Sequence, residues 1–283
     1  MGKSLVLGFF DGVHKAHKAV INSALEISDD VVLITFKESP AKYFVQDVKY
    51  VLSRKNSLDK IRAVGVKNIV ELDFNKIAKM SAGEYLEKLI KMYSPISIST
   101  GFNHTFGVNK SGTPKFLSDN QKKYNYRYIC VAPVKIENEV VSSTLIKNYL
   151  AKGNIQKASS LLESNFILEG TVIHGAKLGR TIGFPTANIS YPSELVQIPF
   201  GVYSVMLTIE NHGELLKGIM NWGMKPTVNN TIEPIAEVHI FNFNNDLYGK
   251  NIKVEVLKQI RGEQKFSSLE ELKIQIKKDI ENA

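Results

Sequence analysis

Two histidines follow a glycine-bracketed turn near the start of the chain. The turn runs from Gly8 to Gly12, and His14 and His17 come directly after it. Apolar residues precede the turn and recur at helical spacing beyond it, so we expect a strand, the turn and then a helix. Such a turn offers backbone N–H groups to phosphate at the helix start, and imidazoles three residues apart can share one helix face. The pattern predicts a site that stabilises phosphate charge.

Two other interpretations of these histidines remain open. Imidazoles at this spacing could bind a metal ion, but Asp11 is the only further ligand nearby, which disfavours a metal site. The pair could also be structural, and the spacing alone does not exclude that.

A second set of candidate residues lies about 160 residues further on. Glycines occur throughout residues 170–183, and Thr186 and Asn188 follow them. A Walker A loop would need Gly-Lys-(Ser/Thr) before a helix, which is not the pattern here. Neutral oxygens suit Mg²⁺, which keeps several waters and binds largely through substrate phosphates. The alternative is an ordinary turn between two strands.

The elements that must position these groups differ between the two halves. In the first half, strands and helices alternate, which predicts a parallel sheet covered on both faces. Ligands of such sheets bind beyond the carboxyl ends of the strands, and the Gly8–Gly12 turn lies at one of these ends. Strands are expected at residues 4–9, 31–36, 68–72, 96–100 and 126–134, and helices at 15–27, 57–64, 81–93, 143–151 and 155–163.

In the second half, strands follow one another without helices, which predicts an antiparallel sheet or a small barrel. An amphipathic helix at 268–280 closes the chain. We therefore expect two domains, residues 1–163 and 164–283. The strands are expected at residues 166–174, 201–209, 214–220, 236–243 and 252–257.

The first half resembles a known module in four ordered segments. Residues 10–17 resemble the start of the nucleotidyltransferase module of bacterial bifunctional riboflavin kinase/FAD synthetases, and residues 52–66, 101–107 and 142–147 resemble its later motifs. The chain departs from the family in having Ala16 for Gly, His104 for Phe and Lys147 for Arg. Lysine keeps the charge but loses the planar fork of donors.

The second half resembles the riboflavin kinase module of the same family. Residues 170–188 resemble its signature, and residues 199–203, 221–227, 237–239 and 246–249 resemble later motifs, followed by Arg261 and Phe266. The resemblance implies an N-terminal Rossmann-like α/β nucleotidyltransferase domain and a C-terminal antiparallel β-barrel riboflavin kinase domain with a closing helix.

The resemblance implies two activities, riboflavin to FMN and FMN to FAD, with ATP and Mg²⁺ in both. In the kinase step, Glu237 would take the proton of the riboflavin hydroxyl, and Thr186 and Asn188 would hold Mg²⁺. In the adenylyl step, the FMN phosphate is already anionic, so His14 and His17 would stabilise phosphate charge without a general base. The residues expected to contact ATP or its phosphates are Gly8, Phe10, Asp11, Gly12, Asn103, Ser143, Thr144, Lys147, Gly175, Gly179 and Arg180, and those expected to contact flavin are Arg261 and Phe266.

The composition narrows the partners. The net charge is +8, but the lysines are scattered, so we expect small molecules (ATP, riboflavin, FMN) rather than nucleic acid. The single cysteine, Cys130, excludes a disulfide framework and, in an apolar stretch, predicts a buried thiol. No apolar run reaches the ~18 residues of a membrane span, and we expect a cytoplasmic protein.

Two rival functions remain. The first module could be degenerate, leaving only the kinase. Alternatively, the chain could be a flavin-binding regulator whose N-terminal domain contacts nucleic acid.

Overall fold

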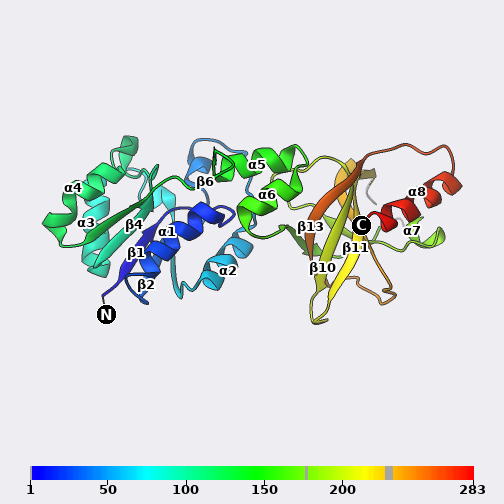
Figure 1. The fold of residues 1–283 in the computed structure, drawn as a ribbon, viewed down its shortest axis with the longest axis horizontal. Coiled ribbons are helices and arrows are strands. Elements are labelled where there is room, and N and C mark those ends of the chain that lie inside the picture. Colours follow the sequence, from blue (N-terminus) through cyan, green and yellow to red (C-terminus); the bar gives the residue numbers. More distant parts are fainter. Residues whose placement is uncertain (1, 176–177, 227–231) are drawn as a thin grey trace. The chain divides into compact units, whose positions relative to one another are not determined.

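The chain folds into two compact units in a computed structural model that describes residues 2–175, 178–226 and 232–283 (Figure 1). The units are Met1–Leu145 and Ile146–Ala283. The segment between Ile146 and Glu163 thus packs with the second unit, whereas the domain boundary expected from the sequence lies at 163/164. That boundary stays a proposal.

The first unit is built on a five-stranded parallel sheet with the order β3-β2-β1-β4-β5. The chain adds strands on one side of β1 and then crosses to the other, so the strand order reverses between β1 and β4. In open parallel sheets, ligands bind at such a switch point, beyond the carboxyl ends of the strands. The strands are β1 (Ser4–Leu7), β2 (Val31–Phe36), β3 (Asn68–Leu72), β4 (Ser97–Gly101) and β5 (Arg127–Val131).

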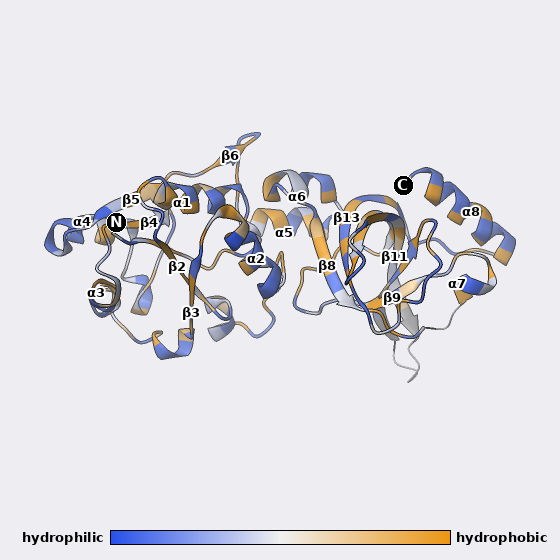
Figure 2. Ribbon diagram, turned by 90° about the horizontal axis from the view of Figure 1, so that it is seen from below, coloured by the Kyte–Doolittle hydropathy of each residue, from blue (hydrophilic) through white to orange (hydrophobic). Residues whose placement is uncertain are grey.

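Helices cover both faces of this sheet, which explains the continuous apolar character of the central strands. On β1, Val6 faces the side of α1 (Lys15–Leu25) and α2 (Arg54–Val64), while its neighbours Leu5 and Leu7 face the side of α3 (Ala82–Tyr93) and α4 (Pro114–Tyr124). The helices carry hydrophilic as well as hydrophobic residues, as Figure 2 shows, because each buries only one face.

Local signals set several element ends. The capping box predicted at Ser81 and Glu84 is present at the start of α3. Helix α2 begins at Arg54, capped by Ser53, earlier than the predicted start at residue 57. Helix α4 was not expected. Shorter elements complete the unit: η1 (Pro40–Tyr43), η2 (Phe74–Lys76), η3 (Val108–Lys110), and the hairpin of β6 (Lys135–Ile136) and β7 (Glu139–Val140).

The second unit is an antiparallel, nearly closed barrel with the strand order β8-β13-β10-β11-β12-β9. A bridge between Ile173 and Asn188 brings its two edges together, beyond β8 on one side and on β9 on the other. The fold class expected for both halves is confirmed. The elements are α5 (Ser143–Ala151), α6 (Ile155–Leu162), β8 (Phe166–Thr171), α7 (Leu178–Thr181), β9 (Ala187–Ser190), β10 (Gly201–Ile209), β11 (Leu215–Pro226), β12 (Ile232–Ile240), β13 (Asn251–Gly262) and the closing helix α8 (Leu269–Glu281).

One prediction about burial was wrong. Cys130 is exposed, because it lies on β5, the edge strand of the first sheet, where alternate side chains face outward. Among the helices that the structure describes, none is long and apolar enough to cross a membrane.

Candidate functional site

A pocket of about 420 Å³ opens at the carboxyl ends of β1 and β4, where the strand order reverses. Segments far apart in the sequence line it: the turn and first helical residues after β1, the ends of β2 and β5 with residues that follow them, the loop after β4, and the residues from β7 to the start of α5. The predicted residues that it brings together are Gly8, Phe10, His14, His17, Asn103, Ser143 and Thr144. The departures Ala16 and His104 line the same pocket.

Side chains from outside the turn after β1 donate hydrogen bonds to its carbonyl groups. The Ser143 hydroxyl donates to the Asp11 carbonyl at 2.8 Å, and the Lys60 ammonium donates to the Gly12 carbonyl at 3.1 Å. The Asp11 carboxylate accepts the buried N–H of Val51 at 2.8 Å. Asp11 and Ser143, both predicted phosphate contacts, thus stabilise the shape of the turn in this structure.

The backbone of the turn is left-handed at two predicted residues. Gly12 has a φ of 84°, which glycine adopts freely, but Phe10 has a φ of 61°. A non-glycine residue in this region costs roughly 1–2 kcal/mol. The Phe10 ring is only 2% exposed and meets the His17 ring edge-on, so packing holds this residue in place. The Gly8 N–H donates to the Ile34 carbonyl, which fixes the start of the turn.

His14 caps helix α1 with its own side chain. Its Nδ1 accepts the backbone N–H of His17 at 3.3 Å. In the neutral imidazole, an accepting Nδ1 leaves the proton on Nε2. His14 is therefore a donor through Nε2, and its ring is stacked on that of His17 with centroids 3.6 Å apart.

Burial keeps both imidazoles neutral. Burial lowers the pKa of His14 to about 4, and the nearby charge of Lys60 adds to this effect. Burial, followed by the neighbouring His14 and Lys60, lowers the pKa of His17 well below its usual range. At pH 7 the pair can donate hydrogen bonds to phosphate oxygens, but it carries no charge. Sequence reasoning did not single out Lys60, although it lies in the 52–66 segment, because its contact with the Gly12 carbonyl joins residues far apart in the chain.

The loop after β4 adds a third buried imidazole. His104 lies near the Phe106 ring, and burial lowers its pKa to about 4. His104 Nε2 and His17 Nδ1 are buried and have no hydrogen-bond partner in the described ranges. Such orphaned atoms are uncommon in folded proteins. Asn103, beside them, is exposed to the pocket.

The predicted phosphate contact Lys147 lies one turn beyond Ser143 on α5, but in the second compact unit. Its place relative to the pocket is therefore not described, and its role stays a prediction.

In the second unit, three polar side chains form a row across adjacent strands. Glu237 on β12 lies opposite Asn188 on β9 and opposite Asn221 on β11. The Asn221 amide donates to one Glu237 carboxylate oxygen at 3.1 Å. Directly opposed side chains share one face of a sheet, so the predicted base and a predicted metal ligand are neighbours. Asn221 was seen in the sequence as part of a motif, but not as the partner of Glu237.

Gly175, in the glycine-rich segment, lies against Asn188 of this row. A Cβ on Gly175 would lie 2.6 Å from the Asn188 amide nitrogen, closer than any side chain tolerates. The Gly179 carbonyl accepts the Phe184 N–H at 2.8 Å, and Arg180 beside it on α7 is exposed. The Pro185 carbonyl, adjacent to Thr186, lies 2.8 Å from His239 Nδ1. Thr227, the last residue of the 221–227 motif, lies outside the described residues.

The two predicted flavin contacts lie near the closing helix. Arg261 on β13 pairs with Asp279 of α8 through Nε at 3.0 Å and Nη2 at 2.9 Å. Asp279 is 1% exposed, so this is a buried anchor for α8. The Arg261 guanidinium also lies over the Phe266 ring at 5.5 Å. A direct contact of either residue with flavin stays a prediction.

Comparisons with known proteins agree across the whole chain. The family model described as FAD synthetase matches residues 1–145, and the model described as riboflavin kinase matches residues 162–283. The bifunctional riboflavin kinase/FMN adenylyltransferase of Bacillus subtilis is 32% identical over 99% of this chain and 90% of its own length. The protein of that name from Escherichia coli K12 is 33% identical over 98% of this chain and 90% of its own.

A solved structure extends this likeness to the fold. A Streptococcus pneumoniae protein, described as a macrolide-efflux protein, is 33% identical with a TM-score of 0.89, over 99% of this chain and 93% of that chain. The family models, the full-length relatives and the two sites lead to one conclusion. The chain belongs to the family of bifunctional riboflavin kinase/FMN adenylyltransferases.

Proposed function

We propose that this chain makes FAD in two ATP-dependent steps, one in each compact unit. The second unit transfers the γ-phosphoryl group of ATP to riboflavin and yields FMN. The first unit joins FMN to the adenylyl group of another ATP and yields FAD and pyrophosphate. Two groupings support this proposal: His14, His17, Asn103 and Thr144 line one pocket in the first unit, and Glu237 lies between Asn188 and Asn221 in the second.

In the kinase step, Glu237 accepts the proton of the riboflavin 5′-hydroxyl. The 5′-oxygen of riboflavin attacks the γ-phosphorus of ATP, and ADP leaves. The Asn221 amide donates to one carboxylate oxygen of Glu237 and so helps to orient the carboxylate.

Magnesium suits this site by the chemistry of its donors. Thr186 and Asn188 offer neutral oxygens, and Asn188 lies opposite Glu237 on the adjacent strand. The rest of the shell would come from phosphates and water. When bound, Mg²⁺ would neutralise phosphate charge during the transfer. The lack of a side chain at Gly175 lets its backbone lie close to Asn188. Gly179 and Arg180 would contact the ATP phosphates.

In the adenylyl step, a phosphate oxygen of FMN attacks the α-phosphorus of ATP. The bond from that phosphorus to the bridging oxygen breaks, and pyrophosphate leaves with the electron pair. The nucleophile is anionic, so the site needs alignment and charge stabilisation rather than a base. His14 donates from Nε2, and the neighbouring His17 supports it. Asn103, from the loop after β4, and Thr144, from the start of α5, would orient the nucleotide.

The test separates the two steps. The chain is incubated with ATP and Mg²⁺ plus either riboflavin or FMN, and FMN and FAD are resolved by chromatography. We expect FAD from both substrates. Glu237→Gln should lower FMN formation by about 10²–10⁴-fold, the usual contribution of a general base, and leave FMN-to-FAD conversion intact. Glu214→Gln, at an exposed carboxylate of the same unit, is the matched control.

Two outcomes would contradict the proposal. If the wild-type chain makes FMN but never FAD, even when FMN is supplied, the chain is a kinase alone. If Glu237→Gln impairs both steps equally in a folded protein, the division of labour between the units is wrong.

A further inference from the structure

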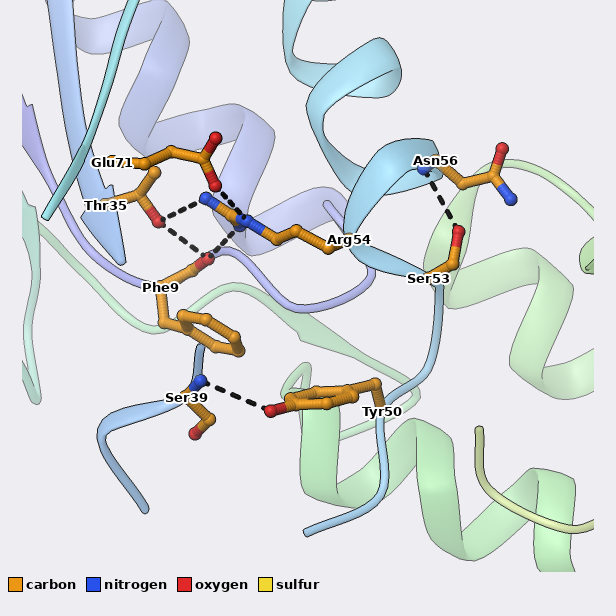
Figure 3. A network of polar contacts seen from close by, with 8 residues as sticks. All are labelled: Phe9, Thr35, Ser39, Tyr50, Ser53, Arg54, Asn56 and Glu71. Carbon is orange, nitrogen blue, oxygen red and sulfur yellow. Dashed lines mark hydrogen bonds and ion pairs between the residues drawn. The ribbon is translucent and has the colours of Figure 1, made fainter. Parts of the chain in front are cut away.

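Arg54 occupies an unusual place for its charge. It is the first residue of α2, where the helix dipole disfavours a cation, and Ser53 already supplies the cap of this helix. Helix stability therefore does not account for an arginine here. Figure 3 shows its side chain reaching back from α2 toward the turn after β1 and the ends of β2 and β3.

The guanidinium joins three acceptors from three elements. Its Nε donates to Glu71 Oε1 on β3 at 2.7 Å, its Nη2 to the Thr35 hydroxyl on β2 at 3.3 Å, and its Nη1 to the Phe9 carbonyl at 3.5 Å (Figure 3). The buried Thr35 hydroxyl donates in turn to the same Phe9 carbonyl at 3.1 Å. The guanidinium carbon also lies 5.5 Å from the centre of the Phe9 ring.

These contacts fix the direction of one peptide plane in the pocket wall. In a trans peptide, the carbonyl and the next N–H point in opposite directions. The pull of Arg54 and Thr35 on the Phe9 carbonyl therefore turns the Phe10 N–H away from them. Phe9 and Phe10 both line the pocket, and the Phe10 N–H makes no hydrogen bond within the described ranges of the chain.

The neighbouring peptide planes follow the same pattern. Ser143 holds the Asp11 carbonyl, which turns the Gly12 N–H the other way, and Lys60 holds the Gly12 carbonyl. Side chains outside the turn thus occupy the Phe9, Asp11 and Gly12 carbonyls, and the Phe10 carbonyl accepts the Val13 N–H. This leaves N–H groups of the turn to meet an anion.

We propose that Arg54 is a positioning residue for adenylyl transfer, which aims the Phe10 N–H at the ATP phosphates by holding the Phe9 carbonyl. This inference rests on the proposed function. Arg54 does not act as a phosphate-attracting charge, because Glu71 neutralises it at 2.7 Å. A planar fork with three bonds cannot be replaced by the single ammonium of lysine.

The test compares FMN-to-FAD turnover in Arg54→Ala, Arg54→Lys and Thr35→Val with wild type. We expect Arg54→Ala to lose about 100-fold, since a displacement near 1 Å in a reacting group has that effect, while riboflavin phosphorylation is unchanged. Arg54→Lys should recover only part of the loss, and Thr35→Val should lose less than Arg54→Ala. Arg62→Ala, at an exposed arginine of the same helix, is the matched control.

Two further measurements separate positioning from a general structural role. Methylguanidinium at low millimolar concentration should raise turnover of Arg54→Ala several-fold, because the Arg54 side chain is 23% exposed and its place can be refilled. A merely loosened fold would not recover. Glu71→Gln should not lower the KM for ATP. If Arg54 attracted the phosphates by its charge, removing the Glu71 charge would strengthen ATP binding and lower that KM.

Full FAD formation by Arg54→Ala overturns the inference, and so does a loss that neither lysine nor methylguanidinium recovers. Unchanged turnover in Thr35→Val counts against it even if the Arg54 variants fail to fold. A wild-type chain that makes no FAD would instead refute the proposed function.

Discussion

The adenylyl site depends on the charge state of its histidines, and one lysine outside the motif helps to set that state. Lys60 donates to the Gly12 carbonyl and lowers the pKa of both His14 and His17. The His14 ring stacks on that of His17, which lies in α1, and it is close to the charge of Lys60, which lies in α2. The site thus offers neutral imidazole donors, and the Lys60 charge helps to keep them neutral.

We expect Lys60→Met to raise the pKa of His14 from about 4 toward 6.5. The unfolded imidazole takes up its proton near pH 6.5, before the buried one does, so the folded state loses stability as pH falls from about 6.5 to about 4. Because Lys60→Met brings the folded pKa of His14 closer to the unfolded one, the variant should lose less stability over this pH range than wild type. The His14 ring signal in an NMR titration measures the pKa directly.

Lys67→Met provides the control, since Lys67 is exposed just beyond the same helix. A His14 titration unchanged by Lys60→Met would show that burial alone accounts for the neutral imidazole.

At the scale of elements, the repeating patterns predicted most of the fold. The central strands and α1 follow directly from runs and spacing of apolar residues. Helix α4 was missed because only Leu117 is fully buried, Phe116 and Tyr124 are partly buried, and most of its other residues are polar. Cys130 was misplaced because an apolar stretch does not reveal that its strand lies at the sheet edge.

The site was predictable where its residues are local in sequence. The turn and the first residues of α1 form one motif, and the sheet topology brings Asn103 to it. The contacts of Arg54, Lys60 and Asn221 join residues far apart in the chain, without a repeating pattern. Only the tertiary structure reveals such contacts.

Helix α8 shows how one ion pair can anchor an element. Its only buried residue is Asp279, while Leu269 and Ile274 are about half exposed. We expect Arg261→Met to destabilise the docked helix by about 3 kcal/mol, since it leaves a buried carboxylate unpaired. Hydrogen exchange over residues 263–283 should rise.

The companion variants make this test specific. Arg261→Met combined with Asp279→Leu should recover part of the stability, because apolar residues often replace a buried pair well. Lys277→Met, at an exposed charge on α8, should change little. Equal destabilisation by the single and the double variant would mean that the ion pair is not the anchor.

At the scale of the whole molecule, the two sites lie in separate compact units, so each should work when the other is disabled. We expect Glu237→Gln to lack the kinase step and His14→Ala to lack the adenylyl step. A mixture of the two variants should convert riboflavin to FAD, since FMN released by one can reach the other. Neither variant alone should convert riboflavin to FAD. In the mixture, FAD formation should rise with the concentrations of the two variants. If the mixture makes FMN but no FAD, while Glu237→Gln still converts added FMN, the intermediate does not leave the chain that forms it.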